Sequence, residues 1–487
     1  MSSFRGLSIG ISGIFAQQRA LDVTGHNISN VNTVGYTRQV VNHSGSTPVN
    51  LGYTRGGTTL QLGTGVDVQM IKQYRDEFLD QKLRKGLNEL GYWGKRQTGI
   101  EELETIFNDN SEEGLQSVMN DFWDSWSQVS KPAGGLTARA LVKESAIAFV
   151  ETVKYLDQTL TNYRNNKDVD IRENVNNLNQ ITKRIAELNK GIRQQEATGA
   201  TANDYRDERS ELINELASMV KVRVIEDGNS FSIAIEGKLA VEDSRYTEIE
   251  VYDDPAFDGY GSLRWADTKG SITLTGGGIK AMFETRDEFV KGYRDRLDEF
   301  VKGFAAEANK IHESGRGIKD DIQRSLFKNV ATGDSTNINL ANIIFNSDLN
   351  DLDNIAAGKG TPGSPADNED NRNANEMLLL RNKKLFSQAK YEDTAPANQK
   401  NTFDEYYRLL ISDLGINGQE AQTAAAAQVT LVSQINNRRT ELSGVSLDEE
   451  MANMIKYEKS YNACARVVNA MDEMIDYIVN KIGIVGR

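Results

Sequence analysis

Residues 454–482 read MIKYEKSYNACARVVNAMDEMIDYIVNKI, and their apolar side chains recur at alternating spacings of three and four. This spacing is typical of the seam of a coiled coil, in which each apolar side chain packs against a partner helix. The segment therefore predicts a terminal helix that needs a partner. Its seam residues are Met454, Tyr457, Tyr461, Cys464, Val468, Met471, Ile475, Ile478 and Ile482.

The other end of the chain carries a matching pattern. Within residues 3–30, one apolar row follows the same spacing and is interrupted only at Gln18 and Gly25. Two terminal helices that each need a partner predict that the chain folds back on itself and that the protein takes part in an assembly. The row consists of Phe4, Leu7, Ile11, Ile14, Leu21 and Ile28.

Small and polar residues accompany this first helix. Asn27 and Asn30 lie where it should end, and asparagine commonly forms hydrogen bonds at helix ends and turns. We expect that role for both residues, with contacts to a neighbouring copy as the alternative. Gly6, Gly10 and Gly13 follow no strand, so we assign them to close helix packing rather than to a phosphate-binding loop.

The middle of the chain changes its apolar period twice. Helical spacing dominates residues 66–219 and 276–443 and predicts an elongated helical bundle, whose residues 314–400 are rich in loop-forming residues. Residues 220–275 instead alternate apolar and polar side chains between Asp-Gly and Glu-Gly turns, which predicts a small β insertion.

These periods predict a nested, multidomain fold that is mainly α. Residues 1–65 and 444–487 should form an inner domain of paired terminal coiled-coil helices. Residues 66–219 and 276–443 should form the elongated helical bundle, with 220–275 as a peripheral β domain.

Composition excludes several classes of function. The chain has 56 Lys+Arg against 70 Asp+Glu and no basic stripe, so we expect no nucleic-acid partner. No apolar run approaches the length of a membrane span, and no cleavable secretory signal is visible. The single cysteine, Cys464, allows no intrachain disulfide, and its place on the seam predicts a small buried apolar residue.

The sequence predicts no catalytic, cofactor-binding or metal-binding residues. The three histidines, His26, His43 and His312, are scattered and lack metal-ligand spacing. Carboxylate pairs such as 101–102 and 449–450 fall on expected solvated helix faces and helix starts. We therefore expect a protein that is not an enzyme.

Two terminal stretches carry a family resemblance. Residues 12–36 read SGIFAQQRALDVTGHNISNVNTVGY, which resembles the N-terminal signature of bacterial flagellar rod, hook and hook-associated proteins. Residues 443–451 read SGVSLDEEM and, with the helix that follows, resemble the C-terminus of the hook-associated proteins. Interior segments at 65–79, 205–212 and 338–374 are also similar to the hook-associated members, and the likeness spans nearly the whole chain.

The resemblance implies a structural building block that joins the flagellar hook to the filament and is needed for filament assembly. A hook or rod subunit is the alternative, and a flagellum-associated hydrolase is less favoured. The family implies secretion through the flagellar type III export apparatus to the extracellular hook–filament junction, with an export chaperone. It further implies a ring of copies that contacts the hook protein and the next hook-associated protein, without cofactor or membrane insertion.

We expect the assembly interface on the terminal helices. The expected interface residues are Phe4, Leu7, Ile11, Ile14, Leu21, Asn27, Ile28, Asn30, Met454, Tyr457, Tyr461, Val468, Met471, Ile475, Ile478 and Ile482.

Overall fold

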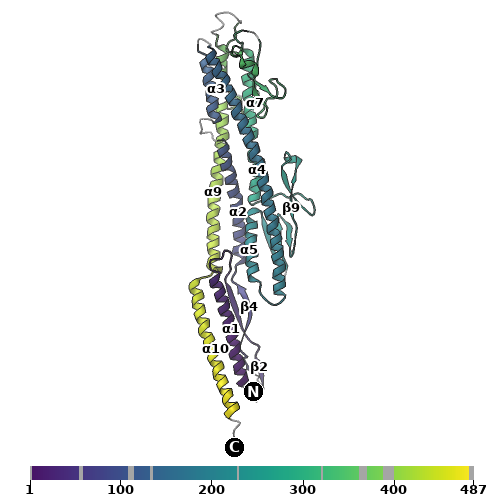
Figure 1. Cartoon of the computed structure of the whole chain (residues 1–487), viewed down its shortest axis with the longest axis vertical. Coiled ribbons are helices and arrows are strands. Elements are labelled where there is room, and N and C mark those ends of the chain that lie inside the picture. The colour runs from purple at the N-terminus through teal and green to yellow at the C-terminus, as the bar shows by residue number, and fades with distance from the viewer. Residues whose placement is uncertain are drawn as a thin grey trace.

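The structure is a computed structural model of the chain, and the molecule is elongated, with both termini at one end (Figure 1). Helices dominate the described residues and strands form only small sheets, which confirms the expected mainly α fold with small β parts. The structure describes the backbone of residues 3–53, 59–107, 114–131, 135–227, 230–319, 322–360, 370–387 and 400–481. Within these ranges, side chains are described at every residue except 3–5, 51–53, 59–60 and 480–481.

The two ends of the chain form one unit at the lower end of Figure 1. Helices α1 (Ser3–Ser29) and α10 (Leu447–Lys481) lie side by side and antiparallel, because the start of α1 faces the late part of α10. Two antiparallel strand pairs, β1 with β4 and β2 with β3, follow α1. We call α1, β1–β4 and α10 the terminal unit. The strands are β1 (Gln39–Gly45), β2 (Val49–Tyr53), β3 (Thr59–Leu62) and β4 (Val66–Gln73).

The rest of the chain forms the helical body, which rises above the terminal unit (Figure 1). Its upper core is aromatic: Phe122, Phe149, Phe300 and Phe304 are fully buried, and the rings of Phe149 and Phe304 lie 4.3 Å apart between centroids. The helices are α2 (Glu77–Phe107), α3 (Leu115–Val129), α4 (Leu136–Glu196), α5 (Asn203–Met219), α6 (Gly278–Glu284), α7 (Lys291–Ser314), α8 (Arg372–Leu380) and α9 (Phe403–Ser443). A π-helical turn, η2 (Thr285–Val290), joins α6 to α7.

Local sequence signals set several of these boundaries. Thr402 accepts a hydrogen bond from the backbone N–H of Glu405, and the Glu405 side chain accepts one from the backbone N–H of Thr402. This reciprocal cap satisfies donors that a helix start leaves unpaired, and it is the capping box that the Thr-x-x-Glu spacing of residues 402–405 favours. At its other end, α9 stops at Ser443, where the backbone N–H of Gly444 donates to the carbonyl of Thr440 (2.8 Å) and the chain then becomes extended.

The β insertion lies on one side of the helical body, where β9 is labelled in Figure 1. A four-stranded antiparallel sheet in the order β5-β6-β7-β8 and a β9–β10 pair make it up. Its apolar side chains, including Ile233 and Trp265, pack with Ile171, Leu178 and Ile185 of α4 in one buried cluster. The strands are β5 (Val222–Asp227), β6 (Ser230–Ile235), β7 (Lys238–Glu242), β8 (Arg245–Tyr246), β9 (Ile249–Asp253) and β10 (Gly261–Trp265).

The region expected to be rich in loops packs on the upper body. Residues 361–369 and 388–399 within it lie outside the described residues. In its described parts, β11 (Phe327–Asn329), which pairs with β12 (Ile343–Phe345), contributes Phe327 to the buried core. Helix α8 contributes Met377, and Phe386 follows that helix. The division of the chain into domains at the residues given above stays a prediction.

Candidate assembly surface on the terminal helices

Glycines let α1 and α10 lie close together. A methyl group built at Gly10 would lie 2.7 Å from Val468 Cγ2, closer than real Cβ atoms approach. The bare backbone at these positions is therefore what allows α10 to lie there, and the expected role of the glycines in close helix packing is confirmed. The three contacts pair Gly6 with Met471, Gly10 with Val468, and Gly13 with Cys464.

The same face of α1 continues with small residues. Ala16 and Ala20 are buried, and Ala20 and Val23 form a small apolar cluster against which Tyr457 of α10 packs. This face lies beside the predicted apolar row, because one residue turns an α-helix by about 100°. The predicted row is thus not the face that α1 turns towards α10. The face of glycines and alanines packs against α10 instead, because its small residues let the two helices approach more closely.

The predicted α1 row faces sideways and outward in the single chain. Ile11 remains 38% exposed, and Phe15, which the apolar spacing missed, remains 63% exposed. Phe15 follows Ile11 by four positions, so the i, i+4 rule was the signal that could have found it. Of the other predicted residues, Leu7, Ile14, Leu21 and Ile28 are half-buried, and the side chain of Phe4 lies outside the described residues.

The predicted α10 seam faces α1 along most of its length. Contacts of Cys464, Val468 and Met471 with the α1 glycines place it there. Ile478 lies two helical turns beyond Met471, which faces the start of α1, and it is 49% exposed. Met454, Tyr457, Tyr461, Cys464, Val468, Met471 and Ile475 are half-buried, and Ile482 lies outside the described residues.

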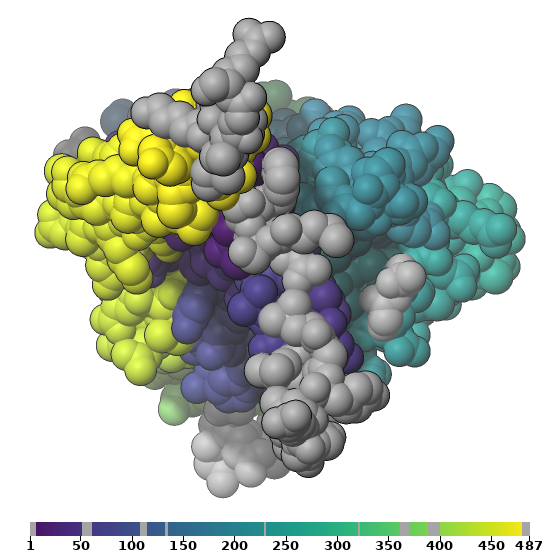
Figure 2. All heavy atoms as spheres, turned by 90° about the horizontal axis from the view of Figure 1, so that it is seen from below, coloured from purple at the N-terminus to yellow at the C-terminus, as the bar shows by residue number. Residues whose placement is uncertain are grey.

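A second apolar row on α10 is open to solvent. Leu447, Met451 and Ile455 recur every four residues and remain 46%, 56% and 55% exposed. Seen from below, α10 borders one side of the molecule with its outer face uncovered (Figure 2). Sequence reasoning missed this row because the longer seam of α10 dominates the apolar pattern.

Asn27 is the centre of a buried hydrogen-bond network at the top of the terminal unit. Its Oδ1 accepts hydrogen bonds from the backbone N–H of Gln39 (3.0 Å) and the hydroxyl of Tyr36 (2.8 Å). Its Nδ2 donates to the Gln39 carbonyl (2.8 Å) and to Glu450 Oε2 (3.0 Å). Asn27 is buried, so in the single chain its side chain serves internal bonds rather than a contact with a neighbour.

Arg38 completes this network with ion pairs to the start of α10. Its guanidinium lies 2.7 Å from Glu450 Oε1 and 2.8 Å from Glu449 Oε2, and Glu450 is buried. The sequence placed Glu450 on a solvated helix start, and the structure corrects this, because folding brings Arg38 and Asn27 to it. Burial raises the pKa of Tyr36, as do carboxylates that include Glu450, so the hydroxyl remains a hydrogen-bond donor.

Asn30 acts locally at the end of α1. Its Nδ2 donates to the carbonyl of His26 (3.0 Å), and its Oδ1 accepts from the hydroxyl of Thr33 (3.1 Å). Both bonds fix the turn that leaves the helix, as expected from the sequence. Asn30 is half-buried, so a further contact with a neighbouring copy stays a prediction.

Within the described ranges, no group of three or more His, Cys, Asp or Glu is arranged to hold a metal ion. Over the same ranges, no helix is both long enough and apolar enough to cross a membrane.

Comparison with known proteins shows similarity along the whole chain. A model of the flagellar hook-associated protein FlgK helical domain matches residues 100–327. The Bacillus subtilis flagellar hook-associated protein 1 is 29% identical over the full length of both chains. The chain is therefore similar from end to end to a protein named flagellar hook-associated protein 1.

Two further relatives in the hook-associated protein 1 family match over most of their length. The Escherichia coli and Salmonella typhimurium proteins are each 24% identical, with 96% of this chain and 98% of theirs covered. The solved structure of the flagellar hook junction protein FlgK from Burkholderia pseudomallei has a TM-score of 0.62 and 13% identity. It covers 75% of this chain and 100% of its own, which shows a common fold.

The two ends of the chain match two further family models. A flagella basal body rod protein model covers residues 7–37, and a model of the C-terminal part of flagellar basal body rod FlgEFG proteins covers 437–481. These matches lie at opposite ends of the sequence. The structure brings them together, because they contain nearly all of α1 and α10.

Proposed function

We propose that this chain is the structural component of the bacterial flagellum that joins the hook to the filament. The observation that carries this function is the match with proteins named flagellar hook-associated protein 1 along the whole chain, from the terminal unit through the helical body. The paired terminal helices, with apolar side chains left open, suit a subunit that is completed by its neighbours. It is a building block rather than an enzyme, as its relatives are structural flagellar proteins.

Assembly buries the apolar residues that the single chain leaves open. Burial of one large apolar side chain contributes about 1.5–3 kcal/mol, while association costs about 4–15 kcal/mol in lost motion. One or two such contacts would not offset that cost, but rows on both α1 and α10 can. We assign the interface to the predicted residues that are open or half-buried, together with Phe15, Leu447, Met451 and Ile455.

The partners that follow from this role are other flagellar proteins. Copies of the chain form a ring that contacts the hook protein on one side and the next hook-associated protein on the other. The chain reaches the extracellular junction through the flagellar type III export apparatus, with an export chaperone that covers it beforehand. The similarity to hook-associated proteins supports this route, and assaying the medium for the chain after its re-expression in the deletion strain described next tests it.

Deletion of the gene tests the function. We expect cells with complete hooks but no filaments, and filament protein released into the medium. A strain that lacks hooks would point instead to a hook or rod subunit, a reading that the rod-protein models at the two termini keep open. Rods stalled at the cell wall would point to a hydrolase. Re-expression of the chain should restore the filaments.

A further inference from the structure

The terminal unit shares no apolar core with the helical body within the described residues. Its own cluster consists of Ala20, Val23 and Val41, with Val68, Ile71 and Tyr457 packed against it. The two larger clusters belong to the upper body and to the β insertion with α4, α5 and α6. Apolar burial therefore does not fix the angle between the terminal unit and the body.

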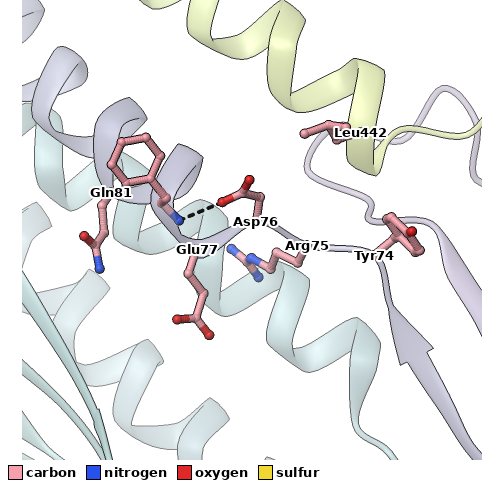
Figure 3. A pocket seen from close by; sticks show the side chains of 7 residues that line it. Tyr74, Arg75, Asp76, Glu77, Gln81 and Leu442 are labelled. Atoms are coloured by element: carbon pink, nitrogen blue, oxygen red, sulfur yellow. Dashed lines mark hydrogen bonds between the residues drawn. The ribbon is translucent and has the colours of Figure 1, made fainter.

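The chain crosses this joint at two short segments. Residues 74–76 connect β4 to α2, and residues 444–446 connect α9 to α10. Figure 3 shows the first crossing, where Tyr74 and Arg75 lie near Leu442 at the end of α9, around a hollow of about 630 Å³. A second hollow, of about 590 Å³, lies between the loop after α1 and helices α2, α5 and α9. Open space at the joint leaves room for the terminal unit to turn.

Hydrogen bonds from one end of α5 hold the joint. The backbone N–H of Thr37 donates to Asp207 Oδ2 (3.0 Å), and Gln39 Nε2 donates to Asp204 Oδ1 (3.1 Å). Asn203 Nδ2 donates to Gln39 Oε1 (3.1 Å). We call Asn203, Asp204 and Asp207 the α5 latch.

Asn203 also reaches the last strand of the terminal unit. Its Nδ2 lies 3.2 Å from the carbonyl oxygen of Ile71, and its backbone carbonyl accepts a hydrogen bond from Gln73 Nε2 (3.1 Å). The latch thus forms hydrogen bonds with both β1 and β4. Water can replace such hydrogen bonds at a small net cost, so a polar joint of this kind is released more easily than an apolar one.

The attachment of the β insertion shows the contrast. It shares a buried apolar cluster with α4, and Asp168 of α4, which pairs with the fully buried Arg286, accepts a hydrogen bond from the backbone N–H of Gly261 in β10 (2.9 Å). Removing part of a buried ion network is costly because it leaves an uncompensated charge. The fold therefore fixes the insertion firmly to the body, whereas the terminal unit shares no apolar cluster with the body among the described residues.

We propose that the α5 latch holds the terminal unit at one angle to the helical body, and that its release lets the unit turn about residues 74–76 and 444–446. The proposal rests on the proposed function, because an adaptor between two unlike tubes must fit its ends to both. Burial raises the pKa of Asp207 to about 6, against the hydrogen bond from Thr37 and the charge of Arg75. At neutral pH the latch therefore contains a carboxylate held charged in a poorly solvated place, which eases release.

Distances between two spin labels test the latch in the full-length monomer. The labels are placed at Lys190→Cys on α4 and Lys459→Cys on α10, both exposed, in a Cys464→Ser background. With the latch intact, we expect one narrow distance distribution. Asn203→Ala with Asp207→Ala should broaden or shift it, whereas Asp207→Asn, which keeps an oxygen acceptor for Thr37, should preserve it. Glu208→Ala, on the exposed face of α5, is the matched control and should change nothing.

Two results would overturn the latch. One is a folded double variant with an unchanged distribution, and the other is an intact chain whose distribution is already as broad as that of the variant. If circular dichroism shows that the double variant does not fold, Gln39→Ala is measured instead. This change removes the side chain of the terminal unit that is hydrogen-bonded to Asn203 and Asp204. A negative result for the latch would not change the phenotype expected of the deletion strain. Filaments on the deletion strain would instead reject the junction function, whatever the distances between the labels.

Discussion

At the residue scale, the glycines of α1 decide how the terminal helices meet. Gly10 faces Val468 with no room for a side chain, whereas Gly25 of the same helix has no atom within 4 Å of the position of an added methyl group. The two positions therefore form a matched pair, in which the same added atom meets a neighbouring helix at one site and open space at the other.

Gly10→Ala should loosen the terminal unit. The added methyl group forces α1 and α10 apart, and overpacking of this kind costs about 1–3 kcal/mol. Amide exchange in α1 and α10 should become faster in the monomer. Gly25→Ala should instead leave exchange unchanged or slow it, because alanine favours a helix over glycine by about 0.5–1 kcal/mol. Equal exchange in the two variants would show that the close approach is not needed.

A buried histidine in the upper body gives stability a pH dependence. His312 accepts a hydrogen bond at Nε2 from the backbone N–H of Ala356 (3.0 Å), and its Nδ1 faces the carbonyl oxygen of Arg324. These partners require the neutral ring with its proton on Nδ1. Burial lowers the pKa of His312 from 6.5 to about 4.

The unfolded chain therefore binds a proton at His312 more readily than the folded chain does. This contribution to the free energy of unfolding is present above pH 6.5 and is lost as the pH falls towards 4, by about 3 kcal/mol. Asp207, with its pKa raised to about 6, acts in the opposite direction in the same window. Urea unfolding should show a smaller loss between pH 6.5 and 4 in His312→Gln than in the wild type. His43→Gln, at an exposed site on β1, should keep the wild-type profile.

At the element scale, the β insertion and α4 depend on each other. The apolar stripe of α4, with Ile171, Leu178 and Ile185 buried at its centre, packs against the insertion. The sequence assigned that stripe to a helical bundle, since periodicity shows which face is apolar but not what covers it. The insertion is peripheral in position, and its core is nevertheless continuous with that of the body.

Replacing residues 226–274 with a short Gly-Ser linker should therefore destabilise the lower body. It would uncover at least five side chains of α4, at about 1.5–3 kcal/mol each, which together approach the whole stability of a typical domain. We expect aggregation or early thermal unfolding on size-exclusion chromatography and circular dichroism. Phe257→Ser, at a half-exposed position on the same insertion, is the control and should unfold with the wild type. A stable, monomeric deletion variant would show that α4 does not rely on this core.

At the scale of the whole molecule, assembly should depend on residues that the monomer does not need. Ile478 lies on the α10 seam beyond the start of α1 and is half-exposed in the single chain. Ile478→Asp should leave thermal unfolding of the monomer unchanged. In the assembly the carboxylate would be desolvated, at a cost of at least a few kcal/mol in every copy, so filaments should fail to attach.

Asn469→Asp provides the matched control for this variant. It adds the same charge to the same helix, and nine positions at about 100° each place it on the opposite face. Motility and filament attachment, compared at equal secretion, should be lost only in Ile478→Asp. Equal motility of the two variants would remove Ile478 from the interface.

The sequence by itself determined the elements and the resemblance to flagellar hook-associated proteins. Local signals suffice for these features, because they act within a few turns or one hairpin: the seam of 454–482, the capping box at Thr402, and the alternation that begins near Val222. The matching apolar spacing at both ends was enough to predict that α1 and α10 pair.

Only the tertiary structure decided which faces meet. The hydrogen bond between Asn27 and Glu450 joins residues 423 positions apart, and no local pattern specifies such a partner. Likewise, the spacing of the α1 row identified an apolar face, but the glycines beside it allowed α10 to pack more closely there and left Ile11 and Phe15 open. The energy of packing two helices depends on contacts between segments that are far apart in the chain. Periodicity within one helix therefore identifies its apolar face, but only the packing decides whether that face is covered or stays open.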